Sequence, residues 1–181
     1  MSLLARVSEV LKAQGIPHVL VGASALTIHG VIRSSLDVDL FTVDRACLDP
    51  RIWDGLATEG VGVEVRKGDL EDPLAGVVRF EVAMELPLDV VVGKHLWQRR
   101  AIERAATATF MGVDVPVLSG VDLILLKLFA GGPQDAWDIQ QLLMGPERES
   151  LIAGVEREIT DLPGHSSRLW ERIVNPGSWA S

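Results

Sequence analysis

The sequence predicts an α/β (α+β) fold, with a small mixed β-sheet flanked by helices and a helical C-terminal part. Apolar residues near the N-terminus recur at helical spacing. Short apolar segments, some of them alternating with polar residues, then occur between short helical segments up to residue 118. From residue 119 onward the apolar spacing is helical. We therefore expect an α/β core over residues 1–118 and a helical part over residues 119–181, packed together as one structural unit.

Glycine, proline and polar residues bound the elements expected in the core. Gly15 ends the first helix, and Pro50 suits the first turn of a later helix. Pro116 lacks an amide hydrogen, so we expect its strand at an edge of the sheet. The expected helices are 3–14, 23–29, 50–57 and 96–106, and the expected strands are 18–22, 36–43, 62–67, 76–83, 86–93 and 113–119.

The helical part is divided by glycine and proline residues. Ser119 is expected to cap its first helix, with Asp122 at the capping-box position. Residues 131–133, Gly-Gly-Pro, end this helix. The remaining expected helices are 134–144 and 146–159, with one further turn around residues 169–170 and fraying after residues 175–176.

The composition is that of an ordinary globular protein, with 48% hydrophobic and 23% charged residues. A formal net charge of −8 argues against binding nucleic acid mainly by neutralising phosphates. Cys47 is the only cysteine, so an internal disulfide is excluded. No apolar run approaches the ~18 residues of a membrane span, and the N-terminus reads as an amphipathic helix rather than a signal peptide. We therefore expect a cytoplasmic protein without a membrane segment.

Two acidic residues lie one residue apart in an otherwise apolar segment. Asp37 and Asp39 share one face of the expected strand, about 7 Å apart. Such carboxylates repel each other and need an arginine, a lysine or Mg²⁺, which binds carboxylates together with substrate phosphates. Asp89, in the apolar strand 86–93, has the same need. It either joins Asp37 and Asp39, if the two strands pair, or binds a backbone amide or an arginine at a strand end.

The stretch Gly22-Ala23-Ser24 follows a strand and opens a short helix. Small residues allow backbone amides to approach a phosphate, and a helix N-terminus attracts anions. The Ser24 hydroxyl is a further phosphate donor. The alternative is a tight turn without a ligand.

Together these segments resemble the nucleotidyltransferase superfamily of the DNA polymerase beta type. Its pattern of a hydrophobic residue, glycine and a small residue, then Asp-hydrophobic-Asp, then a later acid matches residues 21–23, residues 37–39 and Asp89. Ala23 stands where glycine or serine is usual, and Ser24 follows it. A small bacterial branch, which includes toxin-like enzymes of abortive-infection systems, is more similar over residues 15–145. The positions that match that branch are Ala25, His29, Gly30, Arg33, Ser35, Lys127, Asp135 and Asp138.

The resemblance implies transfer of a nucleoside monophosphate from a nucleoside triphosphate, such as ATP, to a hydroxyl acceptor, with release of pyrophosphate. It implies Mg²⁺, or Mn²⁺, held by three carboxylates that are also catalytic, with Asp89 completing the metal site or acting as the base. Lys127 either extends from an apolar helix to solvent or binds nucleotide phosphates. The implied residues are Asp37, Asp39 and Asp89 for metal and catalysis, Gly22, Ala23, Ser24, Arg33 and Lys127 for nucleotide, and Ser35, Asp135 and Asp138 as further candidates.

The acceptor stays open between a small molecule such as an antibiotic, a protein hydroxyl and a tRNA end. A non-catalytic or partner-dependent protein of the same fold is the alternative function. Such a protein would be a toxin–antitoxin component with a helical or antitoxin-like partner, or a binding module. Metal-dependent nucleotide binding distinguishes the two.

Overall fold

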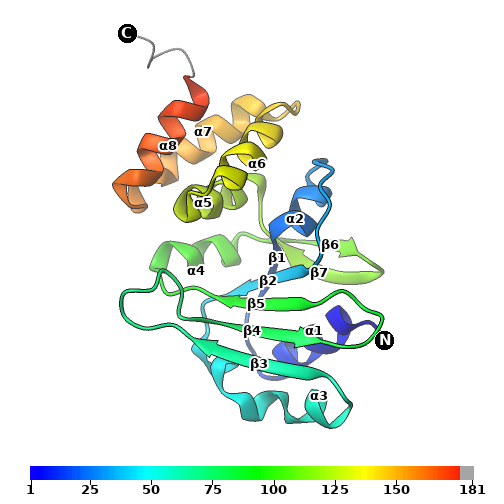
Figure 1. Ribbon diagram of the computed structural model, residues 1–181. Coiled ribbons are helices and arrows are strands. Elements are labelled where there is room, and N and C mark those ends of the chain that lie inside the picture. Colours follow the sequence, from blue (N-terminus) through cyan, green and yellow to red (C-terminus); the bar gives the residue numbers. More distant parts are fainter. Residues whose placement is uncertain (176–181) are drawn as a thin grey trace. The chain divides into compact units, whose positions relative to one another are not determined.

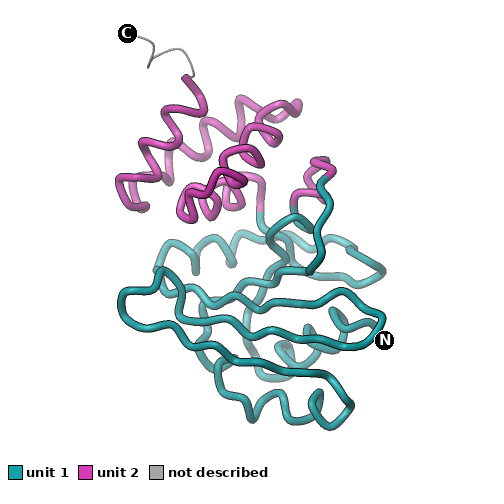
Figure 2. The backbone as a smooth tube through the Cα atoms, viewed as in Figure 1, with its two compact units in different colours: residues 1–25, 33–118 teal, residues 26–32, 119–181 magenta. Residues whose placement is uncertain are grey.

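The structure is a computed structural model, and it describes residues 1–175. Its chain divides into two compact units (Figure 2). The first contains residues 1–25 and 33–118, and the second contains residues 26–32 and the chain from Ser119 onward. Within residues 1–175 no helix has both the length and the hydrophobicity that a membrane crossing requires.

A seven-stranded mixed sheet forms the centre of the first unit, in the order β3-β4-β5-β2-β1-β7-β6 (Figure 1). The pairs β2–β5 and β1–β7 are parallel, and the other pairs are antiparallel. The predicted mixed sheet is therefore confirmed. The strands are β1 (Val19–Val21), β2 (Val38–Thr42), β3 (Gly62–Lys67), β4 (Gly76–Glu81), β5 (Leu88–Val92), β6 (Ala106–Phe110) and β7 (Val113–Val117).

One face of this sheet is apolar and covered. Strand β5, and β4 up to Phe80, alternate between buried and half-buried residues, as period-two strands do, whereas β2 is buried except at Asp39. On the covered face, Trp53 packs edge to face against Phe80, with ring centroids 4.7 Å apart. The opposite face carries the half-buried polar residues of the same strands, including Asp39, Arg79 and Asp89. The helical segments of the unit are α1 (Leu3–Ala13), η1 (Arg45–Leu48), η2 (Pro50–Trp53), α3 (Asp54–Thr58) and α4 (Leu96–Glu103), and α2 (Gly22–Ile28) crosses the boundary of the two units.

The prediction of a single helix over residues 50–57 is wrong. A 3₁₀ turn, η2, precedes a short α3. Asp49 caps η2, because its carboxylate accepts from the Arg51 amide at 3.1 Å. The tighter winding places the buried Trp53 indole so that it donates to the Cys47 carbonyl at 2.8 Å.

Two predictions about the strand containing Pro116 and its neighbour are also wrong. The helix expected to reach residue 106 ends at Glu103, and β6 follows, joined to β7 by the turn Met111-Gly112. Both turn residues have positive φ, 50° and 75°, as a two-residue hairpin requires. Strand β7 lies between β1 and β6 rather than at an edge. Pro116 is tolerated there because the short ladder with β1 pairs Leu20 with Val117, beyond the proline.

Among the described residues, the second unit contains the end of α2 and four helices of eleven residues each, with a 3₁₀ turn, η3 (Ile159–Asp161), among them. Ser119 caps the first of these helices, as predicted, and its hydroxyl accepts from the Asp122 amide at 3.1 Å. The last helix is longer than the single turn expected, and the expected fraying after Pro176 lies outside the described residues. The helices are α5 (Gly120–Ala130), α6 (Pro133–Leu143), α7 (Arg148–Glu158) and α8 (Gly164–Val174).

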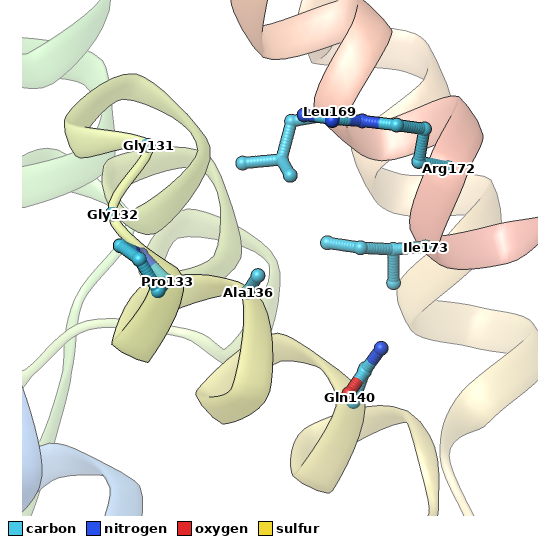
Figure 3. A pocket seen from close by; sticks show the side chains of 8 residues that line it. All are labelled: Gly131, Gly132, Pro133, Ala136, Gln140, Leu169, Arg172 and Ile173. Atoms are coloured by element: carbon cyan, nitrogen blue, oxygen red, sulfur yellow. The ribbon is translucent and has the colours of Figure 1, made fainter.

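A groove of 390 Å³ lies between α8 and the residues from Gly131 to Gln140 (Figure 3). Leu169 and Ile173 face Ala136 across it. Gln140 and Arg172 are the polar side chains among its described lining residues. The groove is therefore mainly apolar.

Candidate active site

Three carboxylates meet on the polar face of the sheet. Asp39 in β2 lies directly opposite Asp89 in the parallel strand β5. Asp37 immediately precedes β2 and lies on the same side as Asp39, because side chains alternate along a strand. Oxygen atoms of Asp37, Asp39 and Asp89 lie within 4.8 Å of one another. Among residues 1–175 they are the one group of three or more acidic, histidine or cysteine side chains close enough to share a metal ion.

The register of β2 and β5 brings these acids together. The two strands pair in parallel from Val38 and Leu88 to Thr42 and Val92, so each residue of β2 faces the residue 50 positions later. Leu40 and Val90 are fully buried on the other face. A shift of one residue would exchange the acids with these apolar side chains, so burial of the apolar face specifies the acidic cluster.

Asp89 is partly enclosed within this cluster, and its side chain is 17% exposed. Burial raises the pKa of the Asp89 carboxyl above its usual value. The positive charge of Arg79 lowers that pKa, and the negative charge of Asp37 raises it further. A carboxyl whose pKa is raised holds a proton more readily than an ordinary aspartate, which suits proton transfer.

Arg79 supplies the positive charge, and it was not among the site residues predicted from the sequence. The residue lies in β4 directly opposite Asp89. Its Nη1 donates to the two Asp89 oxygens at 3.0 and 3.2 Å, while its Nε donates to Glu81 at 2.8 Å. A signal was present: Arg79 interrupts an apolar strand, as Asp89 does in the next strand along the chain. Opposite charges in neighbouring strands often pair.

Ser35 and Arg33 belong to the segment between α2 and β2. The Ser35 hydroxyl donates to Asp37 Oδ1 at 2.6 Å and so orients that carboxylate toward the cluster. Ser35 was predicted as a further candidate, and it contacts a proposed metal ligand. Arg33 is half-buried in the irregular stretch before Ser35.

Gly22 lies against the Asp39 carboxylate. Its φ of +63° is in the left-handed region, which glycine adopts without strain. A Cβ atom at this position would lie 2.1 Å from Asp39 Oδ2. Ala23 and Ser24 follow in the first turn of α2, with exposures of 5% and 6%. The small-residue turn and the carboxylates are therefore one local structure.

Lys127, Asp135 and Asp138 form a second ionic cluster, within the helical unit. The Lys127 ammonium donates to Asp135 Oδ1 at 3.3 Å and to Asp138 Oδ2. Asp138 also accepts from the side-chain amide of Gln134 at 3.3 Å, and Asp135 accepts from the backbone amide of Gly132 at 3.1 Å. Lys127 and Asp138 are buried. Lys127 therefore does not extend to solvent, and its ammonium binds both acids.

A mixed sheet whose paired parallel strands carry clustered acids, followed by a helical unit, is the architecture of a nucleotidyltransferase-like protein. Residues 1–173 match the family described as nucleotidyl transferase of unknown function, DUF2204, and the chain belongs to this family. The superfamily suggested by the sequence motifs is confirmed. The protein is accordingly an enzyme of the nucleotidyl-transferring class.

Solved structures agree on the fold. The solution structure of the antibiotic-resistance factor ANT(2'')-Ia is similar with a TM-score of 0.53 and 18% identity, covering 92% of this chain and 96% of that one. A crystal structure of ANT(2'')-Ia in complex with adenylyl-2''-tobramycin gives a TM-score of 0.55 and 15% identity, covering 87% and 95%. At these identities the likeness shows the fold alone. No curated protein sequence matches significantly.

Proposed function

We propose that the protein transfers a nucleoside monophosphate from a nucleoside triphosphate to a hydroxyl acceptor in a divalent-metal-dependent reaction. The observation that carries the proposal is the approach of Asp37, Asp39 and Asp89 to within 4.8 Å. In the reaction, the acceptor oxygen forms a bond to the α-phosphorus. The bond from that phosphorus to the bridging oxygen breaks, and pyrophosphate leaves.

The donor set fits a hard divalent cation. Three carboxylates and one arginine leave a formal charge of −2 when all four are ionised, and carboxylate oxygens are the ligands that Mg²⁺ and Mn²⁺ prefer. Asp37, Asp39 and Asp89 would hold the ion. Bound there together with the triphosphate, the ion would polarise the phosphoryl oxygens and neutralise negative charge that develops during transfer.

The chain's own groups supply orientation and proton transfer. Ser35 fixes the carboxylate of Asp37. Asp89 either completes the metal site or acts as the base that takes the proton of the acceptor hydroxyl. Gly22 leaves room for the Asp39 carboxylate. The residues proposed to contact the triphosphate are Gly22, Ala23, Ser24 and Arg33. Lys127 is also proposed to bind the nucleotide. In that role its ammonium would release Asp135 or Asp138 and bind a phosphate oxygen instead.

The test is a transfer assay with each of ATP, GTP, CTP and UTP and with Mg²⁺ or Mn²⁺, measuring pyrophosphate release and the mass gained by the acceptor. Asp37→Asn and Asp39→Asn should abolish transfer while the protein still folds. Glu103→Gln is the matched control, because it removes one exposed carboxylate at the end of α4. Turnover retained in both aspartate variants would refute the assignment. Absence of turnover and of nucleotide binding in the wild type would favour the non-catalytic alternative.

The acceptor is tested in the same assay. ANT(2'')-Ia, whose fold is similar, has been seen with an adenylylated antibiotic, so hydroxylated small molecules are the first acceptors to test. Protein hydroxyls and tRNA ends follow. The net charge of −8 disfavours tRNA, because a polyanion needs clustered basic residues. A purified antitoxin-like partner, added to the assay, tests whether activity depends on a second protein.

A further inference from the structure

A row of charged side chains crosses the polar face of the sheet. Strands β2, β5, β4 and β3 follow one another in the sheet (Figure 1), and Asp39, Asp89, Arg79 and Glu64 lie opposite one another in that order. Side chains directly opposite in neighbouring strands share a face. Arg79 therefore lies between the acidic cluster and the outer part of the sheet.

Arg79 divides its guanidinium between two carboxylates. Its Nη1 binds Asp89, which belongs to the cluster, and its Nε binds Glu81, which does not. The Asp89 side chain is 17% exposed and the Glu81 side chain is 63% exposed. The inner pair is thus partly withdrawn from water, where an ion pair is stronger, and the outer pair is open to solvent.

We propose that Arg79 is a positioning residue that competes with the divalent metal for Asp89. A metal held by the three acids would need an oxygen of Asp89, and both Asp89 oxygens already accept from Arg79. Loss of the contact with Asp89 leaves Arg79 with a partner, because Glu81 still accepts from its Nε. Arg79 therefore sets how tightly the acidic cluster holds metal, and it orients Asp89 when metal is absent.

The inference rests on the proposed metal site at Asp37, Asp39 and Asp89. Its consequence is specific in sign. Removing the Arg79 charge should tighten metal binding, because the competitor is lost and the cluster becomes more negative. The same change should lower stability without metal, because the three close carboxylates then lose this counter-ion. A residue that only supported the fold would weaken both properties.

The experiment measures Mn²⁺ binding to the full chain by titration calorimetry, without nucleotide. Arg79→Gln should lower the dissociation constant about threefold to tenfold, and Arg79→Lys, which keeps the charge, should remain within about twofold of the wild type. Arg66→Gln is the matched control, because Arg66 is also bound to a carboxylate, Glu64, and its charge is the weakest of the influences on the pKa of Asp89. Its dissociation constant should change by less than about twofold.

Thermal unfolding in EDTA accompanies each titration and shows that every variant folds. The same scan should give a lower midpoint for Arg79→Gln than for Arg66→Gln. Asp39→Asn is titrated as well, to show that Mn²⁺ binds at the acidic cluster. If the wild type binds Mn²⁺ and Asp39→Asn does not, then unchanged or weaker Mn²⁺ binding by folded Arg79→Gln overturns the inference. If wild-type binding is absent, or survives Asp39→Asn, the metal site itself is wrong, and the inference fails with it. The two failures are thereby distinguished.

Discussion

At Gly22, the absence of a Cβ atom allows the Asp39 carboxylate to lie against the backbone. The Asp39 carboxylate occupies the space that a side chain would fill, and the positive φ also disfavours any residue with a Cβ. Gly15 has a similar φ of +67°, but a Cβ added there would have no described atom within 4 Å beyond its chain neighbours. The two glycines share one backbone requirement and differ in their surroundings, so together they separate strain from steric conflict.

Gly22→Ala should therefore lower the free energy of unfolding by at least about 3 kcal/mol, since strain and the clash with Asp39 add. Gly15→Ala should lower it by about 1 kcal/mol through strain alone. Urea denaturation measures both. Equal losses in the two variants would contradict a steric role for Asp39.

His18 illustrates a second effect at the residue scale, namely pH dependence. The side chain is 5% exposed, its Nδ1 lies 3.0 Å from the Ile16 carbonyl, and its Nε2 has no partner among the described residues. Burial lowers the pKa of the His18 imidazole below 6.5, and the positive charge of Lys12 lowers it further.

Stability should therefore fall as the pH drops below about 6.5, because the unfolded chain binds a proton there that the folded protein excludes. The contribution is fully present above that pH and is lost as the pH falls toward the folded pKa. The slope does not exceed about 1.4 kcal/mol per pH unit, the limit for one proton. Urea denaturation at pH 7.5, 6.5 and 5.5 measures it. His18→Gln should remove this part of the slope, and an unchanged slope would contradict it.

At the scale of elements, α5 and α6 are joined by the ion pairs of Lys127. Asp138 is fully buried, whereas the Asp135 side chain is 25% exposed and also binds the Gly132 amide. Removing one partner of a buried pair leaves a charge without compensation. The helix pair therefore depends more on Asp138 than on Asp135.

Asp138→Ala should lower the free energy of unfolding by about 3 kcal/mol or more, and Asp135→Ala should lower it by about 1 kcal/mol. Chemical denaturation of both variants checks the order. Replacing Lys127 with Met in the Asp138→Ala background should recover part of the loss, because the buried charge is then absent. Failure of that recovery would mean that packing, rather than charge, sets the cost.

At the scale of the whole molecule, ligand binding should raise the free energy of unfolding. A metal–nucleotide complex at about 100 times its dissociation constant adds about 2.7 kcal/mol, which is about 5–10 °C in midpoint for a chain of this length. Thermal unfolding with Mg²⁺ and each of the four nucleotides measures this shift. The double variant Asp37→Asn/Asp39→Asn should lose it, whereas Glu103→Gln should keep it. A shift that survives in the double variant would place the nucleotide elsewhere.

Local patterns by themselves determined much of this protein. Period-two alternation placed Asp37 and Asp39 on one face, glycine and serine marked the end of α1 and the start of α5, and the motif spacing indicated the superfamily. Each of these depends on residues close together in the chain. The same patterns failed for β6, because its residues Ala106–Phe110 are exposed or half-buried and carry little apolar signal.

Only the tertiary structure decided which distant residues meet. The sequence left open whether Asp89 joins the other acids, and the parallel register of β2 and β5 brings it there. The position of Arg79 opposite Asp89, and the closure of Lys127 onto Asp138, likewise depend on how separate elements pair. The physical reason is that periodicity and capping are set within a few residues, whereas strand order and register are set by burial of the whole apolar face.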